Sequence, residues 1–445
     1  MRAWRGRRSR VAEELADQPE RPAEELADQP DKVAEELADQ PDKVAEELAD
    51  QPERPAEELA DREFVFTEEQ RALRAAVRAF CAEHIGESAV RAAMESDTAF
   101  DRAVWQRLGS ELGVLGLSVP ESAGGVGGTL VDQAVAVEEL GAALAFGPLF
   151  GTVYLAIPAL VAASASGGLL DSLVDGSRTA AFAVSERGAT FDSAAVSVDA
   201  SPDGSSWAVT GTVERVVDAG AADLLLVAAN TADGIALFAV DTDHADVQRI
   251  PLGTLDLTRP QATVTLTAAP AELVAGAEEA ERVITHALQI GAALLAVEQV
   301  GAAQRLLDLS VDYAKTRLQF GRPIGSFQAI KHRLANDLVA VEHARSTAYH
   351  AVWALADASD DPALTVSIAQ AICSSAFVQV AGDTIQIHGG IGFTWEHQAH
   401  LYYKRAYTDA ALLGSAEEHR ARIAEFVLDA APSKDAPRVA TGMPR

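Results

Sequence analysis

The chain has 445 residues, of which 48% are hydrophobic, and it carries a formal net charge of −30 at pH 7. This length and composition are typical of a globular protein with two or three domains and a large core. So acidic a surface repels phosphate backbones and anionic headgroups, so we expect no nucleic-acid or anionic-membrane partner. The two cysteines, Cys81 and Cys373, provide neither a disulfide framework nor metal-ligand spacing, which predicts no metal site and a reducing, cytoplasmic location.

The first 63 residues are dominated by an acidic repeat. The eleven-residue unit AEELADQPxxx starts at Ala12, and its last copy starts at Ala56. Proline occurs in every copy but the last, and each copy has a single large apolar residue, so neither a continuous helix nor a sizeable core can form. We predict a disordered acidic extension over residues 1–63, or short helical turns broken at each proline. An expanded repeat without a role is the simpler explanation.

Residues 64–175 are predicted to form an N-terminal helical domain. Apolar residues between Leu73 and Phe80 recur three and four positions apart, and Thr67 precedes two glutamates as a helix cap. A glycine-rich loop follows the segment SVPE. The uncharged run from Gly141 to Leu170 is interrupted by glycine and proline, so we predict buried helices there and no membrane span.

The remaining chain divides into a β-rich part and a helical part. Over residues 176–275, short β-branched segments such as SWAVTGTVERVV and QATVTLT are separated by turn residues, which predicts a middle antiparallel β domain. Helical periodicity returns over residues 276–430, a C-terminal domain resembling a four-helix bundle, and a proline-rich tail follows at 431–445. The predicted fold class is therefore α+β multidomain.

The C-terminal domain contains two motifs that suggest a ligand. The first, YAKTRLQFGRPIGSFQAIKHRLAND, spans Tyr313 to Asp337, and the second, QIHGGIGF, begins at Gln386. Gly389 and Gly390 follow a long apolar stretch, so the chain should end a helix there and expose backbone N–H groups with no side chain in the way. Such a turn suits a phosphate or the edge of a flavin.

In this order and spacing the motifs resemble those of acyl-CoA dehydrogenases, and the resemblance extends from about residue 66 to about residue 428. The chain is similar in particular to subunits of actinobacterial-type hetero-oligomeric members. The resemblance implies an acyl-CoA dehydrogenase fold and an FAD-dependent flavoprotein, an oxidoreductase acting on CH–CH groups of an acyl-CoA thioester. It places the chain in lipid metabolism, in fatty acid beta-oxidation or steroid side-chain breakdown, with an electron-transfer flavoprotein or a similar acceptor as a partner.

The family's catalytic glutamate has no counterpart at its two usual positions. Ungapped alignment places Leu413 at one of them and Gly291 at the other, and neither residue can accept a proton. Glu298 lies about two turns, roughly 10 Å, beyond Gly291 on the same apolar helix. It is either a relocated base or a carboxylate that is paired in the core or at an interface. The small residues from Gly291 to Ala293 suggest room for a bulky acyl group.

Residues that bind FAD across a subunit interface in the family are kept in this chain. An arginine beside a backbone turn suits a diphosphate. The resemblance assigns the adenine and diphosphate side of a neighbouring subunit's FAD to Arg317, Gln319, Phe320, Gly321, Gln328, Gln386, His388, Gly389 and Gly390.

Residues that hold the flavin ring in the family are replaced. Ser185 and Glu186 resemble the start of the family's ring-binding loop, but Thr190 and Phe191 follow where the family has glycine and serine. The family's Trp-Ile-Thr becomes Arg215, Val216 and Val217. The loss of a tryptophan and a hydroxyl removes both packing and a hydrogen bond to the ring.

This division predicts one subunit of a heterotetramer or similar hetero-oligomer, in which a second acyl-CoA dehydrogenase-like subunit supplies the base and the ring pocket. Two alternatives stay open. One is a non-catalytic structural or regulatory subunit that binds flavin only at its edge. The other is a flavin monooxygenase of the same fold, which needs no glutamate base. His388, His397 and His400 lie close in sequence but show no pattern of a known metal site.

Overall fold

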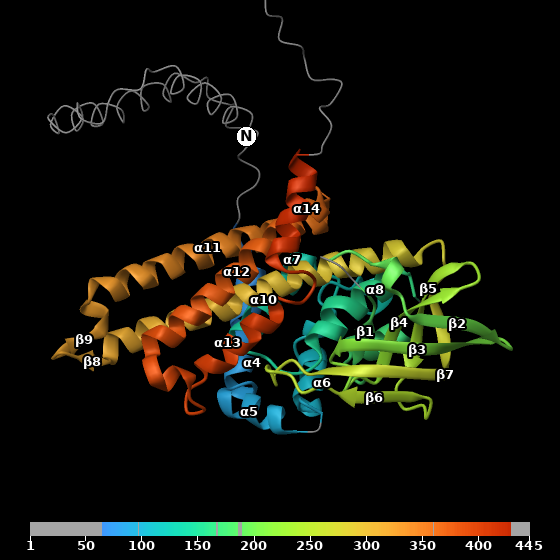
Figure 1. The fold of residues 1–445 in the computed structure, drawn as a ribbon, viewed down its shortest axis with the longest axis horizontal. Coiled ribbons are helices and arrows are strands. Elements are labelled where there is room, and N and C mark those ends of the chain that lie inside the picture. The colour runs from blue at the N-terminus through green and yellow to red at the C-terminus, as the bar shows by residue number, and fades with distance from the viewer. Residues whose placement is uncertain (1–64, 97, 166–167, 186–188, 359, 429–445) are drawn as a thin grey trace, which may run out of the picture. The chain divides into compact units, whose positions relative to one another are not determined.

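The computed structural model describes residues 65–428 apart from 97, 166–167, 186–188 and 359. The predicted extension over residues 1–63 and the predicted tail over 431–445 lie outside the described residues. Within the described part, helices come first, a β-rich region follows, and long helices complete the chain (Figure 1). This order confirms the predicted fold class.

The first helical region packs onto the C-terminal helices. Its main helices are α4 (Glu68–His84), α5 (Glu87–Glu95), α6 (Arg102–Ser110) and α7 (Leu130–Ala142). The predicted cap at Thr67 is confirmed: its hydroxyl accepts the backbone N–H of Gln70, and the Gln70 side chain accepts the backbone N–H of Thr67. Because α7 contacts both α4 and α10 (Ala280–Thr316), it links the two helical regions.

The uncharged run forms buried helical structure, as predicted, but part of it is a π-helix. This element, η4 (Leu149–Ala156), continues into α8 (Ile157–Ala162), and α9 (Gly168–Val174) follows. Every residue of η4 is buried. At Gly151 an added Cβ would lie 2.5 Å from the carbonyl oxygen of Ala180, so only glycine lets η4 approach the sheet this closely. π-helical turns are rare and occur frequently at functional sites.

The middle region is a seven-stranded, mainly antiparallel sheet. Its strands are β1 (Ala180–Ala183), β2 (Val198–Asp203), β3 (Ser206–Val217), β4 (Leu224–Thr231), β5 (Gly234–Asp241), β6 (Val247–Pro251) and β7 (Gln261–Ala275). The pairings from β4 through β2, β3, β7 and β5 lead back to β4, so the sheet closes on itself around an apolar core. The pairings of β4 with β1 and with β2 are parallel, in contrast to the predicted antiparallel arrangement.

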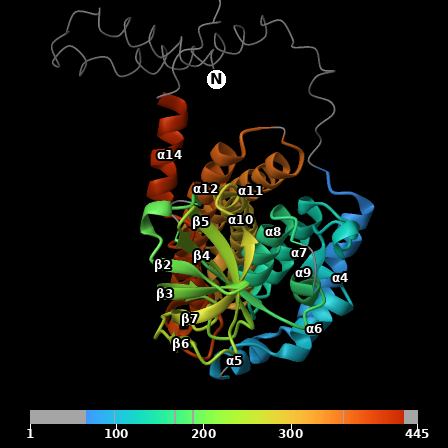
Figure 2. The ribbon, with the colours of Figure 1, turned by 90° about the vertical axis from the view of Figure 1, so that its right-hand side faces the viewer.

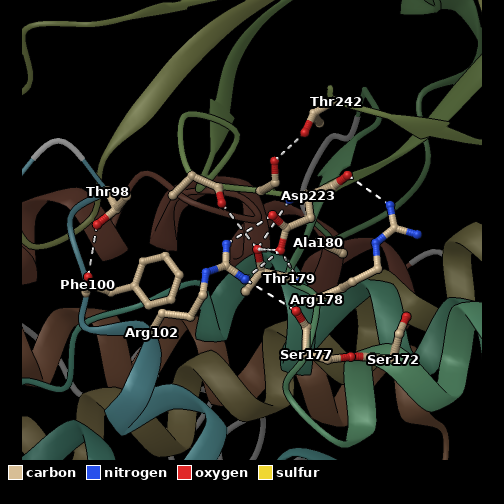
Figure 3. Close-up of polar contacts among 12 residues, drawn as sticks. Thr98, Phe100, Arg102, Ser172, Ser177, Arg178, Thr179, Ala180, Asp223 and Thr242 are labelled. Atoms are coloured by element: carbon tan, nitrogen blue, oxygen red, sulfur yellow. Dashed lines mark hydrogen bonds and ion pairs between the residues drawn. The ribbon is translucent and has the colours of Figure 1, made fainter. Parts of the chain in front are cut away.

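A polar junction fixes the first helical region to the sheet (Figure 3). Arg102 of α6 donates two hydrogen bonds of 3.0 Å to the carboxylate of Asp223, just before β4. The same carboxylate accepts the backbone N–H of Thr179 at 2.9 Å and its hydroxyl at 3.0 Å. A bidentate pair of this kind fixes the orientation of the two groups as well as their distance. The junction therefore sets how α6 meets the edge of the sheet.

Three long helices form the C-terminal region. These are α10, α11 (Gln328–Asp357) and α12 (Pro362–His388), which pack against one another, and the shorter α13 (Ala399–Asp409) and α14 (Ala416–Leu428) follow. Between α10 and α11 the chain forms a short hairpin of β8 (Leu318–Gln319) and β9 (Arg322–Pro323). The hairpin lies at the opposite end of the long helices from the sheet (Figure 1), which Figure 2 views from the sheet side.

α10 and α12 are long and apolar enough to cross a membrane by length and composition alone. However, 78% of the apolar window in α10 and 61% of that in α12 lie inside the fold. Burial of this extent is typical of helices at the core of a globular bundle.

Candidate functional site

A cavity of about 1040 Å³ lies where the sheet, η4 and the segment after α13 meet. We call it the sheet cavity. The end of β3 contributes residues 212–217, η4 contributes Phe150 and Leu155, and the chain after α13 contributes Leu412 and Leu413. A volume of this order is typical of a small-molecule site, and the wall of this one combines apolar with polar side chains. The sequence-predicted ring-lining residues and one of the two glutamate positions thus face the same space.

Leu413 lies in the wall of the sheet cavity and is buried, with 3% of its surface exposed. Its backbone adopts the left-handed conformation, with φ at 55°, and its carbonyl oxygen accepts a hydrogen bond of 2.9 Å from Nε2 of His419. The side chain is therefore held in place at the cavity, and as a hydrocarbon it can exclude water there but cannot take a proton.

Gly291 faces η4, and the space beside it is already filled. A Cβ on Gly291 would lie 2.4 Å from Cδ2 of Leu155, which itself lines the sheet cavity. The neighbouring Ala292 and Ala293 are completely buried. The expectation that these small residues leave room for a bulky acyl group is therefore wrong, because close packing with η4 uses that room.

Glu298 lies in a buried group of charged residues behind the wall of the sheet cavity. One carboxylate oxygen accepts from Arg259 at 2.5 Å and from Arg405 at 2.6 Å, and the other accepts the hydroxyl of Tyr154 at 2.9 Å. Arg405 also donates to Asp256 at 3.0 Å. The charge cluster, which we define as Asp256, Arg259, Glu298, Arg405 and Asp409, joins the sheet side of the fold to α10 and α13.

The electrostatics of the charge cluster oppose a role for Glu298 as a base. Burial alone would raise its pKa, but the guanidinium groups of Arg259 and Arg405 outweigh burial and hold the pKa at about 2. A carboxylate with so low a pKa and with both oxygens bonded is a poor proton acceptor. Glu298 is also absent from the described residues that line the sheet cavity. These contacts favour the paired, structural interpretation of Glu298 over the relocated base.

Two other carboxyl groups near the sheet cavity behave differently. Burial raises the pKa of Asp409 to about 7, although Arg259 lies 3.4 Å from it. Burial also raises the pKa of Asp218 to about 6, and this carboxylate accepts the backbone N–H of Gly151 in η4 at 2.9 Å. Arg259 stacks over the ring of Phe150 at 5.2 Å. Through these contacts the charged groups support η4, which forms part of the cavity wall.

The two sequence motifs come together at the other end of the long helices. The rings of Tyr313 on α10 and His388 on α12 stack with their centres 4.4 Å apart, and Ile324 and Ile387 pack beside them. We call the surface formed by residues 317–328 and 386–393 the bundle end. Segments that lie about 60 residues or more apart in the sequence thus form one surface there.

The predicted flavin residues at the bundle end are accessible, with one exception. Phe320 is 91% exposed at the tip of the hairpin, whereas His388 is buried, and its Nδ1 donates to the carbonyl oxygen of Thr384 at 2.9 Å. Burial lowers the pKa of His388, so the imidazole is neutral at pH 7. The exposed members are Arg317, Gln319, Phe320, Gly321, Gln328, Gln386, Gly389 and Gly390.

The glycines of the bundle end leave room for close approach by another molecule. No atom lies within 4 Å of the position that a Cβ would take at Gly321, Gly389 or Gly390. Both Gly321 and Gly389 have positive φ, at 76° and 65°, a conformation that favours glycine. Open backbone beside the exposed guanidinium of Arg317 fits the diphosphate part of FAD.

The sheet cavity fits the flavin ring less well. Val216 and Val217 lie in its wall where the family has side chains that pack on the ring and bond to it, and neither valine carries a donor. Arg215, which the sequence resemblance aligns with the family's tryptophan, also lines the cavity and carries a charge. Ser185 also lines the cavity, but its hydroxyl donates to the carbonyl oxygen of Ala195 at 3.0 Å, and Glu186 lies outside the described residues.

Sequence reasoning missed the part of the site that η4 contributes. Phe150 and Leu155 line the cavity, but in the sequence they belong only to an uncharged run, which is equally typical of ordinary core helices. The three histidines do come near one another, with the rings of His388 and His397 centred 4.4 Å apart. Over the described residues, however, no group of His, Cys, Asp and Glu has a geometry that would hold a metal ion.

Comparison with known proteins gives a consistent result. Residues 67–165 match the N-terminal domain of acyl-CoA dehydrogenases and residues 281–428 match their C-terminal domain. The chain is 37% identical to the acyl-CoA dehydrogenase IpdE2 of Mycobacterium tuberculosis, over 79% of this chain and 95% of that protein. Among solved structures, it is similar to a chain of the ChsE4–ChsE5 complex of M. tuberculosis, with 29% identity, a TM-score of 0.74 and coverage of 84% and 100%. It is also similar to a chain of the steroid enzyme Tcur3481–Tcur3483, with 31% identity, a TM-score of 0.71 and coverage of 81% and 98%.

Proposed function

Since the chain belongs to the acyl-CoA dehydrogenase family, whose FAD-dependent members oxidise CH–CH groups, we propose that it is one subunit of a hetero-oligomeric acyl-CoA dehydrogenase. In this proposal the chain lacks the usual catalytic glutamate, and a second subunit of the same family supplies it. The reaction is the α,β-dehydrogenation of an acyl-CoA thioester, and the electrons leave through an electron-transfer flavoprotein or a similar acceptor. The cytoplasm stays the predicted location.

One observation supports this proposal: the bundle end is assembled and exposed, while the two positions that the sequence resemblance aligns with the family's base hold Leu413 and Gly291. Tyr313 and His388 bring the two flavin motifs together, and Arg317 is exposed at the end of α10. At the other end of the long helices, Leu413 fills one position of the base and Leu155 packs against the other. In this proposal the chain supplies residues to a neighbouring flavin, and the second subunit supplies the group that removes the substrate's proton.

When bound, FAD supplies the hydride acceptor for the carbon that lies β to the thioester. The residues of this chain would bind and orient it from the neighbouring side. Arg317 offers a cation to the diphosphate, and the backbone N–H groups after Gly389 can approach it without obstruction. The buried ring of His388 is held by Thr384 and Tyr313, so it fixes the position of the turn that follows it.

The names of two relatives support a two-chain enzyme. The ChsE4–ChsE5 and Tcur3481–Tcur3483 structures are each named for a pair of chains, and the second is named as a steroid acyl-CoA dehydrogenase. A similar pairing would explain why this chain has an intact interface motif and a replaced ring pocket. A steroid-derived acyl group is a candidate substrate for the same reason.

The test is reconstitution. The chain is purified alone and together with a glutamate-containing acyl-CoA dehydrogenase-like chain from the same genome, and flavin content and oligomeric mass are measured for each. The proposal predicts little flavin in the chain alone, and flavin with acyl-CoA-dependent reduction of an electron acceptor in the mixed oligomer. A full complement of flavin in the isolated chain, reduced by an acyl-CoA, would contradict it.

The same samples separate the two alternatives. A non-catalytic structural or regulatory subunit would enter the oligomer, but removing its flavin-contacting residues would leave turnover unchanged. A flavin monooxygenase would bind flavin as an isolated chain and consume oxygen with a substrate that need not be a thioester. The replacements in the predicted ring pocket do not favour the regulatory subunit or the monooxygenase over the two-chain dehydrogenase.

A further inference from the structure

The first half of α11 presents apolar side chains to the outside of the fold. Leu338 and Val339 are 49% and 69% exposed, and Ala335, one turn before them, is also exposed. In Figure 1 this helix lies along the upper edge of the long helices. Apolar side chains that gather on one exposed face, in contrast to those scattered singly, indicate an interaction surface.

A groove of about 640 Å³ lies beside these side chains, between α11 and α10. Its apolar lining includes Leu307 and Val311 from α10, and Leu334 and Leu338 from α11. The exposed residues of α10 along the groove are charged. An apolar centre with a polar rim is the usual composition of a protein interface. We define the α11 face as residues 331–342 together with the α10 residues that line this groove.

The α11 face is balanced in charge, in contrast to the chain as a whole. Two copies of a chain with a net charge of −30 repel each other, so they are favoured to meet where the acidic excess is absent. On α11 the apolar group lies between one cation, Lys331, and one anion, Glu342. The charged residues of α10 along the groove also cancel, since they are Arg305, Lys315, Asp308 and Asp312.

The order of side chains along α11 is self-complementary. Lys331, Ala335, Leu338 and Glu342 form one stripe, because they are spaced four, three and four residues apart. If a second copy of α11 packs antiparallel about a two-fold axis, Ala335 of one copy lies opposite Leu338 of the other, and Lys331 lies opposite Glu342. A small side chain then meets a large one, and a cation meets an anion at both ends of the contact.

The same arrangement uses the groove. It places Val339 of one copy opposite Leu334 of the other, and Leu334 lines the groove. Glu342 is available for the second copy, because its contact with Arg345 is long at 3.4 Å and Arg345 also pairs with the buried Glu138. A parallel pair of helices would place like charges opposite each other at both ends, so the antiparallel pair is favoured.

We propose that two copies of this chain meet at the α11 face, with their α11 helices antiparallel. The inference does not rest on the proposed function, because it concerns a contact between identical chains. Together with the bundle end, which the proposed function gives to a second kind of subunit, it leads to an assembly with two copies of each chain. That composition is a heterotetramer.

The test is the mass of the full chain, purified alone and sedimented at several concentrations. We expect a dimer that Val339→Asp weakens at least about tenfold, because the new charge is buried twice, once in each copy. Val339 is 69% exposed in the single chain, so the variant should fold as the parent does. As a matched control, Val427→Asp changes an exposed valine of α14 and should leave the dimer intact. A chain that is monomeric at every concentration, or a Val339→Asp variant that dimerises as the parent does, would overturn the inference.

A charge exchange shows whether the partner is a second copy. Lys331→Glu and Glu342→Lys each place like charges opposite each other, so each should weaken the dimer several-fold. The double variant restores opposite charges only if the same two positions meet across a two-fold axis, and it should recover most of the loss. A double variant as weak as the single ones would contradict the antiparallel contact between identical chains.

Other occupants of the α11 face give different results. If the second kind of subunit binds there, Val339→Asp releases that subunit from the mixed oligomer, and the isolated chain is monomeric. If identical chains meet through the bundle end, Phe320→Ala weakens the dimer of the isolated chain and Val339→Asp does not. Either result overturns the inference.

This inference and the proposed function can fail separately. If the mixed oligomer holds flavin and turns over but the isolated chain is monomeric, the α11 contact fails alone. If the isolated chain dimerises as expected but no mixture with a partner holds flavin, the subunit proposal fails and the α11 contact stands.

Discussion

The charge cluster and the bundle end use polar residues in opposite ways. In the cluster, Glu298, Arg259 and Arg405 are buried and bind one another, so that part of the fold is complete within a single chain. At the bundle end, Arg317 and Phe320 project from the surface, next to glycine backbone that no side chain covers. The first region is built to hold the chain together, and the second is built to meet another molecule.

Breaking the charge cluster should have the largest effect on stability. Arg405→Met removes the cation that pairs with Asp256 and one of the two cations that pair with Glu298, all in a buried environment, so we expect the free energy of unfolding to fall by about 3–5 kcal/mol. Denaturant unfolding of the full chain measures this change. Lys315→Met removes an exposed cation whose ion pair with Asp312 spans 3.8 Å, and it should cost less than about 1 kcal/mol. Similar losses for the two variants would show that the cluster is not a structural anchor.

Adding a methyl group where α10 packs against η4 should have an intermediate effect on stability. Gly291→Ala forces a methyl group against Leu155, and overpacking of this kind costs about 1–3 kcal/mol. Gly382→Ala, in α12, meets no atom within 4 Å and should be neutral or stabilising by up to about 1 kcal/mol. Gly291→Ala should cost less in a Leu155→Ala background than in the parent, because the shorter side chain leaves room for the added methyl group. Thermal unfolding of these variants tests this, and a Gly291→Ala variant as stable as the parent would argue against tight packing there.

The pH dependence of stability should report on Asp409. Its pKa is about 7 in the fold and lower in the unfolded chain, so the unfolded chain releases its proton first as pH rises. Wild-type stability should therefore fall between about pH 4 and pH 7, by at most about 1.4 kcal/mol for each pH unit from this group. Glu298, with a pKa of about 2 in the fold, contributes an opposite rise in stability as its unfolded-state carboxyl ionises, and this rise is nearly complete above about pH 5.

The control for this pH effect is a variant in which an amide replaces the Asp409 carboxyl group. Asp409→Asn cannot ionise, so its stability relative to the wild type should rise from pH 5 to pH 7 and then level off. Chemical unfolding at four pH values in this range would measure the difference. A difference that is constant with pH would show that Asp409 is already ionised in the fold.

Removing an exposed side chain at the bundle end should have the smallest effect on the chain itself. Phe320→Ala should change the free energy of unfolding of the isolated chain by less than about 0.5 kcal/mol, because the ring packs little inside the fold. It should nevertheless weaken the mixed oligomer, which sedimentation at several concentrations would show. Leu428→Ala removes another exposed apolar side chain, in α14, and should leave assembly unchanged. If both variants assemble as the wild type does, Phe320 is not part of the interface.

The fold class and the bundle end could be predicted from the sequence because their signals are local. The capping residues at Thr67 and the glycines after His388 define helix ends within a few residues. The charge cluster could not be predicted in this way, since Glu298 is 39 residues from Arg259 and 107 residues from Arg405. The π-helical geometry of η4 was equally hidden, because it depends on how closely Gly151 approaches the sheet.

The measurement that tests the central claim most directly is the flavin occupancy of the mixed oligomer when Arg317 is changed. Arg317→Gln should lower the flavin content of the partner's site at least several-fold without altering the stability of this chain, whereas Lys315→Gln, which removes a charge two residues away on α10, should not lower it. An oligomer that keeps full flavin with Arg317→Gln would contradict the claim that this chain completes a neighbouring flavin site.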